Sequence, residues 1–176
     1  NRCHSACHLT PILPYTNFSS NKDMTTTASF SEFCATADAR ERIQENILLW
    51  CQMLCEALEQ DFVEETIRRQ KFFAATGNAD YHNARIEAVK NGEDTYKFII
   101  ETGRKYHKII MVTESGSRSV HAFVDKKTGE LYKSASFKAP AKGVRFDLRI
   151  IKEREFVLEN ADWAGGYLYR NANYEG

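Results

Sequence analysis

A group of cationic and aromatic side chains in the C-terminal half has the chemistry to bind an anionic polymer. These residues are Lys133, Phe137, Lys138, Lys142 and Arg145. Lys and Arg neutralise phosphates, and an exposed ring can stack on a base, so the combination suits a nucleic-acid strand. The alternative is a basic loop that keeps a sheet edge soluble while the ring joins the core. The stretch contains no RNP-type signature of RNA-binding domains.

The charge of the chain is divided between its two halves. Residues 96–149 contain twelve Lys and Arg against five Asp and Glu, a formal charge of +7. Residues 30–95 contain seven against thirteen, a formal charge of −6, and the whole chain is neutral. This separation indicates a polyanionic partner for the basic half, or association of that half with the acidic half of another copy.

Familiar catalytic patterns are absent from the sequence. It contains no GxSxG, HExxH or paired CxxC motif, and its Gly165-Gly166 pair lacks the Lys-Ser/Thr partner of a phosphate-binding loop. The remaining enzymatic alternative is a pocket lined by His121, Asp125 and Tyr132, which would supply acid–base groups. We therefore favour a non-enzymatic protein without a cofactor, and keep an enzyme without a familiar motif as the alternative.

One cluster near the N-terminus holds side chains of the types that bind zinc. It consists of Cys3, His4, Cys7 and His8. Two thiolates and two imidazoles would complete a tetrahedral site. Their spacing differs from that of a zinc finger, so we expect no metal to be bound.

Residues 1–23 differ from the rest of the chain. They contain two prolines, show no periodic apolar face, and lack the basic start and apolar core of a secretory signal. We expect Met24 to be the natural start and residues 1–23 to be an extension outside the fold; the alternative is an ordered arm of a longer chain. Residues 24–176 then form a single domain, and no apolar run approaches the ~20 residues that a membrane helix needs.

The N-terminal half predicts one long helix from about residue 30 to residue 75. Apolar side chains recur there at three- and four-residue steps, which is the spacing of one helix face. They are Ile43, Ile47, Trp50, Cys51, Leu54, Cys55, Leu58 and Phe62. Gly77 ends this helix, and residues 79–90 predict a shorter second helix. The two cysteines share the apolar face, and we interpret them as small buried groups.

The basic half predicts an antiparallel sheet, because four segments rich in aromatic and β-branched residues are joined by short turns. These segments are residues 96–101, 106–113, 118–125 and 130–137. Side-chain alternation predicts which residues face the long helix. That set is Ile109, Met111, Val120, Ala122, Val124, Leu131 and Ala135. His121 and Tyr132 then point to the opposite face.

Together the elements predict an α+β fold. A long N-terminal helix packs on a four-stranded antiparallel β-meander, and residues 150–160 form a C-terminal helix. Residues 144–149 are a candidate for a further short strand. Each of these elements has one apolar face, and packing them together is what buries it.

Residues 120–143 resemble a block found in small uncharacterised proteins of tailed bacteriophages. The shared features are a hairpin of the form FVD-x-x-TG-x-x-YK, here residues 123–133, and an S-x-K-AP-A-K loop, here residues 136–142. A Gly- and Tyr-rich C-terminal end, here residues 165–169, is also similar. The resemblance implies a viral origin and expression inside a bacterial host. It brings no known activity, so it transfers no catalytic residue.

The leading hypothesis is a small non-enzymatic phage protein of the host cytoplasm. It would bind an anionic partner, nucleic acid before any other polyanion, through its basic hairpin and loop. The alternative is a protein–protein module that acts on a host or virion component, or that forms a homo-oligomer through complementary halves. No association with a membrane is expected.

Overall fold

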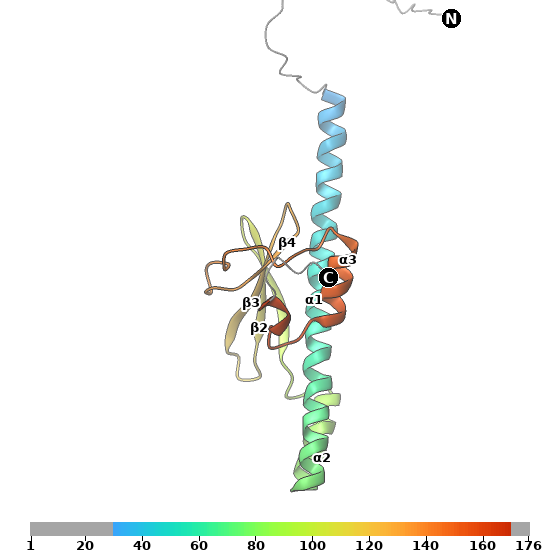
Figure 1. Cartoon of the computed structure of the whole chain (residues 1–176), viewed down its shortest axis with the longest axis vertical. Helices are drawn as coiled ribbons and strands as arrows, with labels where there is room; N and C mark the ends of the chain where they lie inside the picture. Colours follow the sequence, from blue (N-terminus) through green and yellow to red (C-terminus); the bar gives the residue numbers. More distant parts are fainter. Residues whose placement is uncertain (1–29, 170–176) are drawn as a thin grey trace, which may run out of the picture.

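The computed structural model describes residues 30–169 and shows the α+β fold that the sequence predicts (Figure 1). The side chains of residues 30, 31 and 33 are outside this description. The expected extension at residues 1–23 with its zinc-type cluster, and the start at Met24, also lie outside the described residues. A long helix packs along one face of an antiparallel sheet, and a C-terminal helix lies beside the same long helix.

The long helix α1 (Phe30–Thr76) is the central element of the fold. Its 47 residues include neither Pro nor Gly, so no residue interrupts its hydrogen bonds, and it is about 70 Å long at 1.5 Å per residue. From Ile47 to Phe62 the residues of the predicted stripe are buried, except Trp50, which is half-buried. Ile43, which the pattern also placed in the stripe, is 42% exposed because α1 extends beyond the sheet toward its N-terminus (Figure 1).

A second helix, α2 (Ala79–Lys90), forms a hairpin with the C-terminal part of α1. Asn78 caps this helix, because its side-chain oxygen accepts a hydrogen bond from the backbone N–H of Tyr81 at 3.3 Å. Ile86 and Val89 are the buried residues of α2. The second helix is therefore confirmed at the predicted residues.

The sheet has five antiparallel strands in sequence order. They are β1 (Lys97–Thr102), β2 (Tyr106–Val112), β3 (Arg118–Asp125), β4 (Glu130–Lys133) and β5 (Phe146–Asp147). The predicted meander had four strands; β5 lies within residues 144–149, the candidate for a further short strand, and its two residues pair with β4. β4 is shorter than predicted because the chain leaves the ladder after Lys133 and forms a loop that returns at Pro140. Ala135 lies in this loop, so its predicted place on the helix-facing side of the sheet is wrong.

A β-bulge changes which side chains of β3 face α1. The pairing of β2 with β3 shifts between Ile109 and Ile110, so β3 holds one extra residue, His121. Alternation consequently shifts by one position. His121 points to the α1 side, where its ring centre lies 5.4 Å from that of Phe98, and Val120 points to the other side. The prediction of the reverse arrangement for these two residues is wrong.

The core lies between α1 and the α1-facing side of the sheet. Its fully buried members include Ile47, Cys51, Leu54, Leu58, Ile109, Val124 and Leu131. Burial raises the pKa of Cys51 and Cys55 to about 12, so both thiols are neutral apolar groups, as expected. The helix α3 (Ile151–Asn160) adds Val157, and the 3-10 helix η1 (Gly166–Tyr169) adds Leu168. Within the described part of the chain, every helix is too short or too polar to cross a bilayer.

We expect Leu54→Ala to lower the free energy of unfolding by roughly 2–5 kcal/mol, because it leaves a cavity at a fully buried position. Leu49→Ala is the matched control, since Leu49 lies on the same helix but is 51% exposed. Its effect should stay within about 0.5 kcal/mol. Urea unfolding followed by circular dichroism measures both. Equal losses would contradict the packing of α1 against the sheet.

Candidate functional site

Two turns of the sheet bring basic side chains to one end of the molecule. Successive strands of a meander alternate in direction, so the β1–β2 turn and the β3–β4 turn lie at the same edge. The first turn carries Arg104 and Lys105, and the second carries Lys126 and Lys127. The backbone N–H of Lys126 donates to the carbonyl of Lys105 at 3.0 Å, which joins the two turns directly.

Asp125 fixes the conformation of the second turn. Its carboxylate accepts hydrogen bonds from the backbone N–H groups of Lys127 at 2.8 Å and of Thr128 at 3.1 Å. Gly129 follows with a φ of +69°, and the side chain of Arg149 lies 3.1 Å from where a Cβ would be. The hydrogen bonds from the turn backbone to the Asp125 carboxylate therefore hold the segment that carries Lys126 and Lys127 in one conformation.

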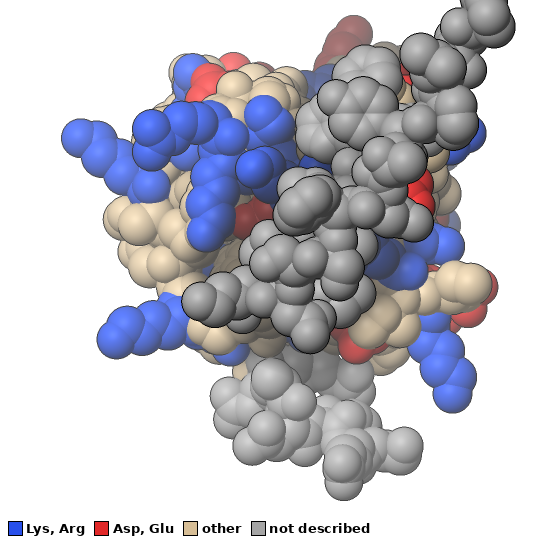
Figure 2. All heavy atoms as spheres, turned by 90° about the horizontal axis from the view of Figure 1, so that it is seen from above, with Lys and Arg blue, Asp and Glu red and all other residues tan. Residues whose placement is uncertain are grey.

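The N-terminal part of α1, which projects beyond the sheet, lies beside these turns. A hollow of about 420 Å³ lies between Gln44 and the turn residues, and an adjoining hollow of about 440 Å³ is lined by Arg40, Ile43, Gln44 and Lys127. We call the combined depression the hairpin groove. Its charged residues are Arg40, Arg104, Lys105, Asp125, Lys126 and Lys127. Figure 2, which views the molecule from above, shows Lys and Arg side chains gathered on this end.

The cations of the hairpin groove are only partly neutralised. The buried carboxylate of Asp125 lies nearest to Lys105, whose Nζ is 3.8 Å from Oδ2. Lys126 donates through Nζ to the carbonyl of Gly103 at 3.2 Å. The groove cations that make no ion pair within residues 30–169 are Arg40, Arg104, Lys126 and Lys127. Their charge is available to a ligand, because no carboxylate among the described residues lies within ion-pair distance of them.

Two of the residues that the sequence predicted as a binding site lie on different faces of the sheet. Lys133 lies on the α1 side, with Nζ 3.8 Å from the centre of the Tyr169 ring. Phe137 lies on the opposite side, where Nζ of Lys108 donates to its carbonyl at 3.1 Å and lies 5.2 Å from its ring centre. A single flat ligand surface therefore does not include both residues.

The other three predicted residues belong to the loop of residues 134–145. Lys138 and Lys142 are exposed, and neither makes an ion pair among the described residues. Arg145 is half-buried; its backbone N–H donates to the carbonyl of Leu131 at 2.8 Å, and its Nε has no hydrogen-bond partner. The loop thus presents two unpaired lysines and the 45% exposed ring of Phe137, and their role in binding stays a prediction.

Sequence reasoning missed the hairpin groove, although one signal for it was present. A meander already places the turns around residues 103–105 and 126–129 at the same end, and each turn holds an adjacent pair of basic residues. Arg40 and Gln44 gave no such signal. Nothing in the helical pattern shows that α1 extends past the turns.

The three residues of the enzymatic alternative do not converge. Asp125 caps the β3–β4 turn, whereas the hydroxyl of Tyr132 donates to Glu130 at 2.6 Å on the face away from α1. His121 lies on the α1 side, 3.0 Å from the hydroxyl of Tyr167. That catalytic pocket is therefore contradicted. No group of three or more Cys, His, Asp or Glu within residues 30–169 could hold a metal ion.

Residues 30–170 match the model of a family of unknown function, DUF7717. The chain belongs to this family. The match spans every helix and strand described above, and with them the turns of the hairpin groove and the loop of residues 134–145. No curated protein and no solved structure matches the chain. Membership of DUF7717 therefore identifies the domain and assigns no activity to it.

We expect the free energy of unfolding to fall as the pH is lowered from 7 to 5, because of His121. Burial lowers the pKa of His121 to about 4, from the 6.5 of an exposed histidine. A histidine with a depressed pKa in the folded state binds its proton more tightly when unfolded, so acid favours unfolding. The expected loss is roughly 1–2 kcal/mol.

Urea unfolding of the wild type and of His121→Asn at pH 7 and pH 5 measures this dependence. The variant should lose less stability on acidification than the wild type. His107, whose pKa is also lowered by burial, contributes equally in both proteins. The same loss in both would show that His121 is not the responsible group.

Proposed function

We propose that this chain binds nucleic acid through the hairpin groove, without catalysis. The observation that carries the proposal is that α1 and two turns place five cations around two adjoining hollows. The one carboxylate among the lining residues, Asp125, already accepts two backbone hydrogen bonds. A concave surface of one charge concentrates the electrostatic field and attracts phosphates.

The distribution of charge favours a polymer over a small anion. The two hollows share Gln44 and Lys127, so the positive surface continues from the turns to α1. Lys138, Lys142 and Phe137 lie in the loop beyond the opposite end of β4, and strands of this sheet span about 20 Å. A nucleic-acid strand that crosses the sheet could therefore contact both the groove and the loop.

A second candidate function is a protein–protein contact through the far end of the helical hairpin. Phe72 and Tyr81 are 67% and 60% exposed there, and the rings of Phe73 and His82 stack at 5.7 Å. Exposed aromatic groups are enriched in protein interfaces. The formal charge of −6 on residues 30–95 would suit a basic surface of the partner, including the hairpin groove of another copy.

As part of the proposal, we place the chain in the cytoplasm of a bacterium infected by a tailed phage. Support comes from the hairpin and loop motifs of residues 120–143, which resemble those of phage proteins. The partner would then be a nucleic acid, or a protein of the host or of the virion.

Arg104→Glu combined with Lys127→Glu should weaken binding of a labelled oligonucleotide by at least about tenfold at moderate salt. Both residues lack an ion-pair partner among residues 30–169, so their loss removes two phosphate contacts without breaking an ion pair. The plot of log affinity against log salt concentration should become less steep, with the magnitude of its negative slope smaller by about 2. Fluorescence anisotropy with single- and double-stranded probes at several salt concentrations measures both quantities.

The matched control is Arg68→Glu combined with Lys71→Glu. These residues are exposed on the C-terminal part of α1, far from the groove, and the change in net charge is identical. An equal loss of affinity in the control would mean that only net charge matters. A third double variant, Lys138→Glu with Lys142→Glu, is measured in the same way. If it alone loses affinity for the oligonucleotide, the binding surface is the loop of residues 134–145.

A further inference from the structure

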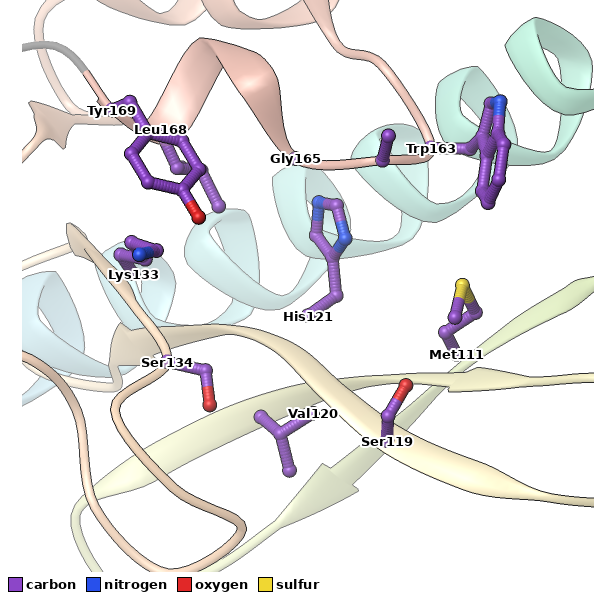
Figure 3. Close-up of a pocket in the computed structure, with 11 residues that line it drawn as sticks. Met111, Ser119, Val120, His121, Lys133, Ser134, Trp163, Gly165, Leu168 and Tyr169 are labelled. Carbon is purple, nitrogen blue, oxygen red and sulfur yellow. The ribbon is translucent and has the colours of Figure 1, made fainter.

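A cavity of about 490 Å³ lies between the bulge in β3 and the C-terminal segment that contains η1. Its lining includes His121 from the bulge, Lys133 from β4, and Trp163 and Tyr169 from the C-terminal segment (Figure 3). We call it the His121 cavity. Its volume falls within the range of small-molecule binding sites. It is separate from the hairpin groove, with which it shares no lining residue.

Two aromatic rings stand at opposite ends of the His121 cavity, with His121 between them (Figure 3). The ring of Trp163 is held in place: its indole N–H donates to Glu65, and its backbone N–H donates to Asp61 at 2.9 Å. The Tyr169 ring is 69% exposed and carries the ammonium of Lys133 over its face. The Trp163 ring provides a rigid surface for a planar ligand, and the Tyr169 ring holds the Lys133 ammonium at the other end of the cavity.

Three polar groups that line this cavity have no hydrogen-bond or ion-pair partner among the described residues. Nε2 of His121 is 3.0 Å from the Tyr167 hydroxyl, which leaves Nδ1 without a hydrogen-bond partner among the described residues. The hydroxyl of Ser119 and the ammonium of Lys133 also make no hydrogen bond or ion pair within residues 30–169. Burial lowers the pKa of His121, so the ring is neutral at pH 7 and can donate or accept a hydrogen bond.

Gly165 keeps the cavity open beside His121. Its φ is +82°, a conformation that other residues rarely adopt, and a Cβ there would lie 3.5 Å from Cε1 of the imidazole. A side chain at this position would therefore be strained and would occupy space next to the unpaired Nδ1. The backbone thus passes close to the ring without covering it.

We propose that the His121 cavity binds one nucleotide, with the phosphate at Lys133 beside Tyr169 and the base beside His121 and Trp163. The cation would neutralise the phosphate, the Trp163 ring would contact the base, and Nδ1 of His121 and the Ser119 hydroxyl would bond its polar edge. The choice of a nucleotide over other anionic ring compounds rests on the proposed nucleic-acid binding. The ligand is either a free mononucleotide or one unit of a single strand.

The test uses tryptophan fluorescence of the full chain. Trp50→Phe leaves Trp163 as the remaining tryptophan, and AMP, CMP, GMP, UMP and phosphate-free adenosine are titrated in turn. Saturable quenching by at least one mononucleotide is expected, because a base would lie against the Trp163 ring. Calorimetric titration of the unmodified chain with the same compounds keeps the test decisive if Trp50→Phe disturbs folding. No saturable binding in either measurement overturns the proposal.

Lys133→Gln should weaken mononucleotide binding about tenfold, the usual effect of losing one charged hydrogen bond, and leave adenosine binding unchanged. Lys71→Gln is the matched control, since Lys71 is exposed on the C-terminal part of α1 and is not part of the cavity lining. Equal losses in the two variants would overturn the placement of the phosphate.

Arg104→Glu with Lys127→Glu separates this inference from the proposed function. That double variant should bind mononucleotides as the wild type does, even where it no longer binds an oligonucleotide. Failure of the hairpin groove and failure of the His121 cavity are therefore distinguishable. Competition between the bound mononucleotide and a single-stranded oligonucleotide would identify the ligand as a unit of a strand, and independent binding would identify it as a free mononucleotide.

Discussion

The packing of α1 against one face of the sheet is the interaction on which the rest of the structure depends. Neither the helix nor the sheet can bury its apolar face alone. Glu59 fixes where they meet, because its carboxylate accepts a hydrogen bond from the backbone N–H of Phe98 at 2.8 Å and lies 3.6 Å from Lys97. With that point fixed, a rigid helix necessarily carries Arg40 and Gln44 past the turns at the other end of the sheet.

The same packing explains why the charges collect at the ends of the molecule. An unpaired charge is costly to bury, so the α1–sheet interface is apolar. Six of the basic residues occupy turns and loops: Arg104, Lys105, Lys126, Lys127, Lys138 and Lys142. The hairpin groove arises where two such turns meet the projecting helix. The acidic residues follow α1 and α2 instead. A chain with no net charge therefore has a strongly positive end, which total charge alone conceals.

The C-terminal segment is held by polar contacts to α1 and to the bulge. Trp163 bonds to Asp61 and Glu65, and Tyr167 bonds to His121. These contacts place η1 over the bulge and create the His121 cavity between them. Both candidate sites therefore depend on α1, the hairpin groove through its projecting N-terminal part and the cavity through its buried middle. Each is built from segments that are far apart in the sequence.

The sequence by itself determined the α+β class, α1, α2, α3 and the meander, because these follow from local periodicity and turn residues. It also determined that the turns at residues 103–105 and 126–129 share one end of the sheet. Only the tertiary structure decided that His121 faces α1, because a bulge of one residue reverses the alternation and leaves no clear mark in the pattern. Only the tertiary structure decided that Arg40 and Lys127 line one hollow and that Trp163 and His121 line one cavity, because such proximity depends on how whole elements pack.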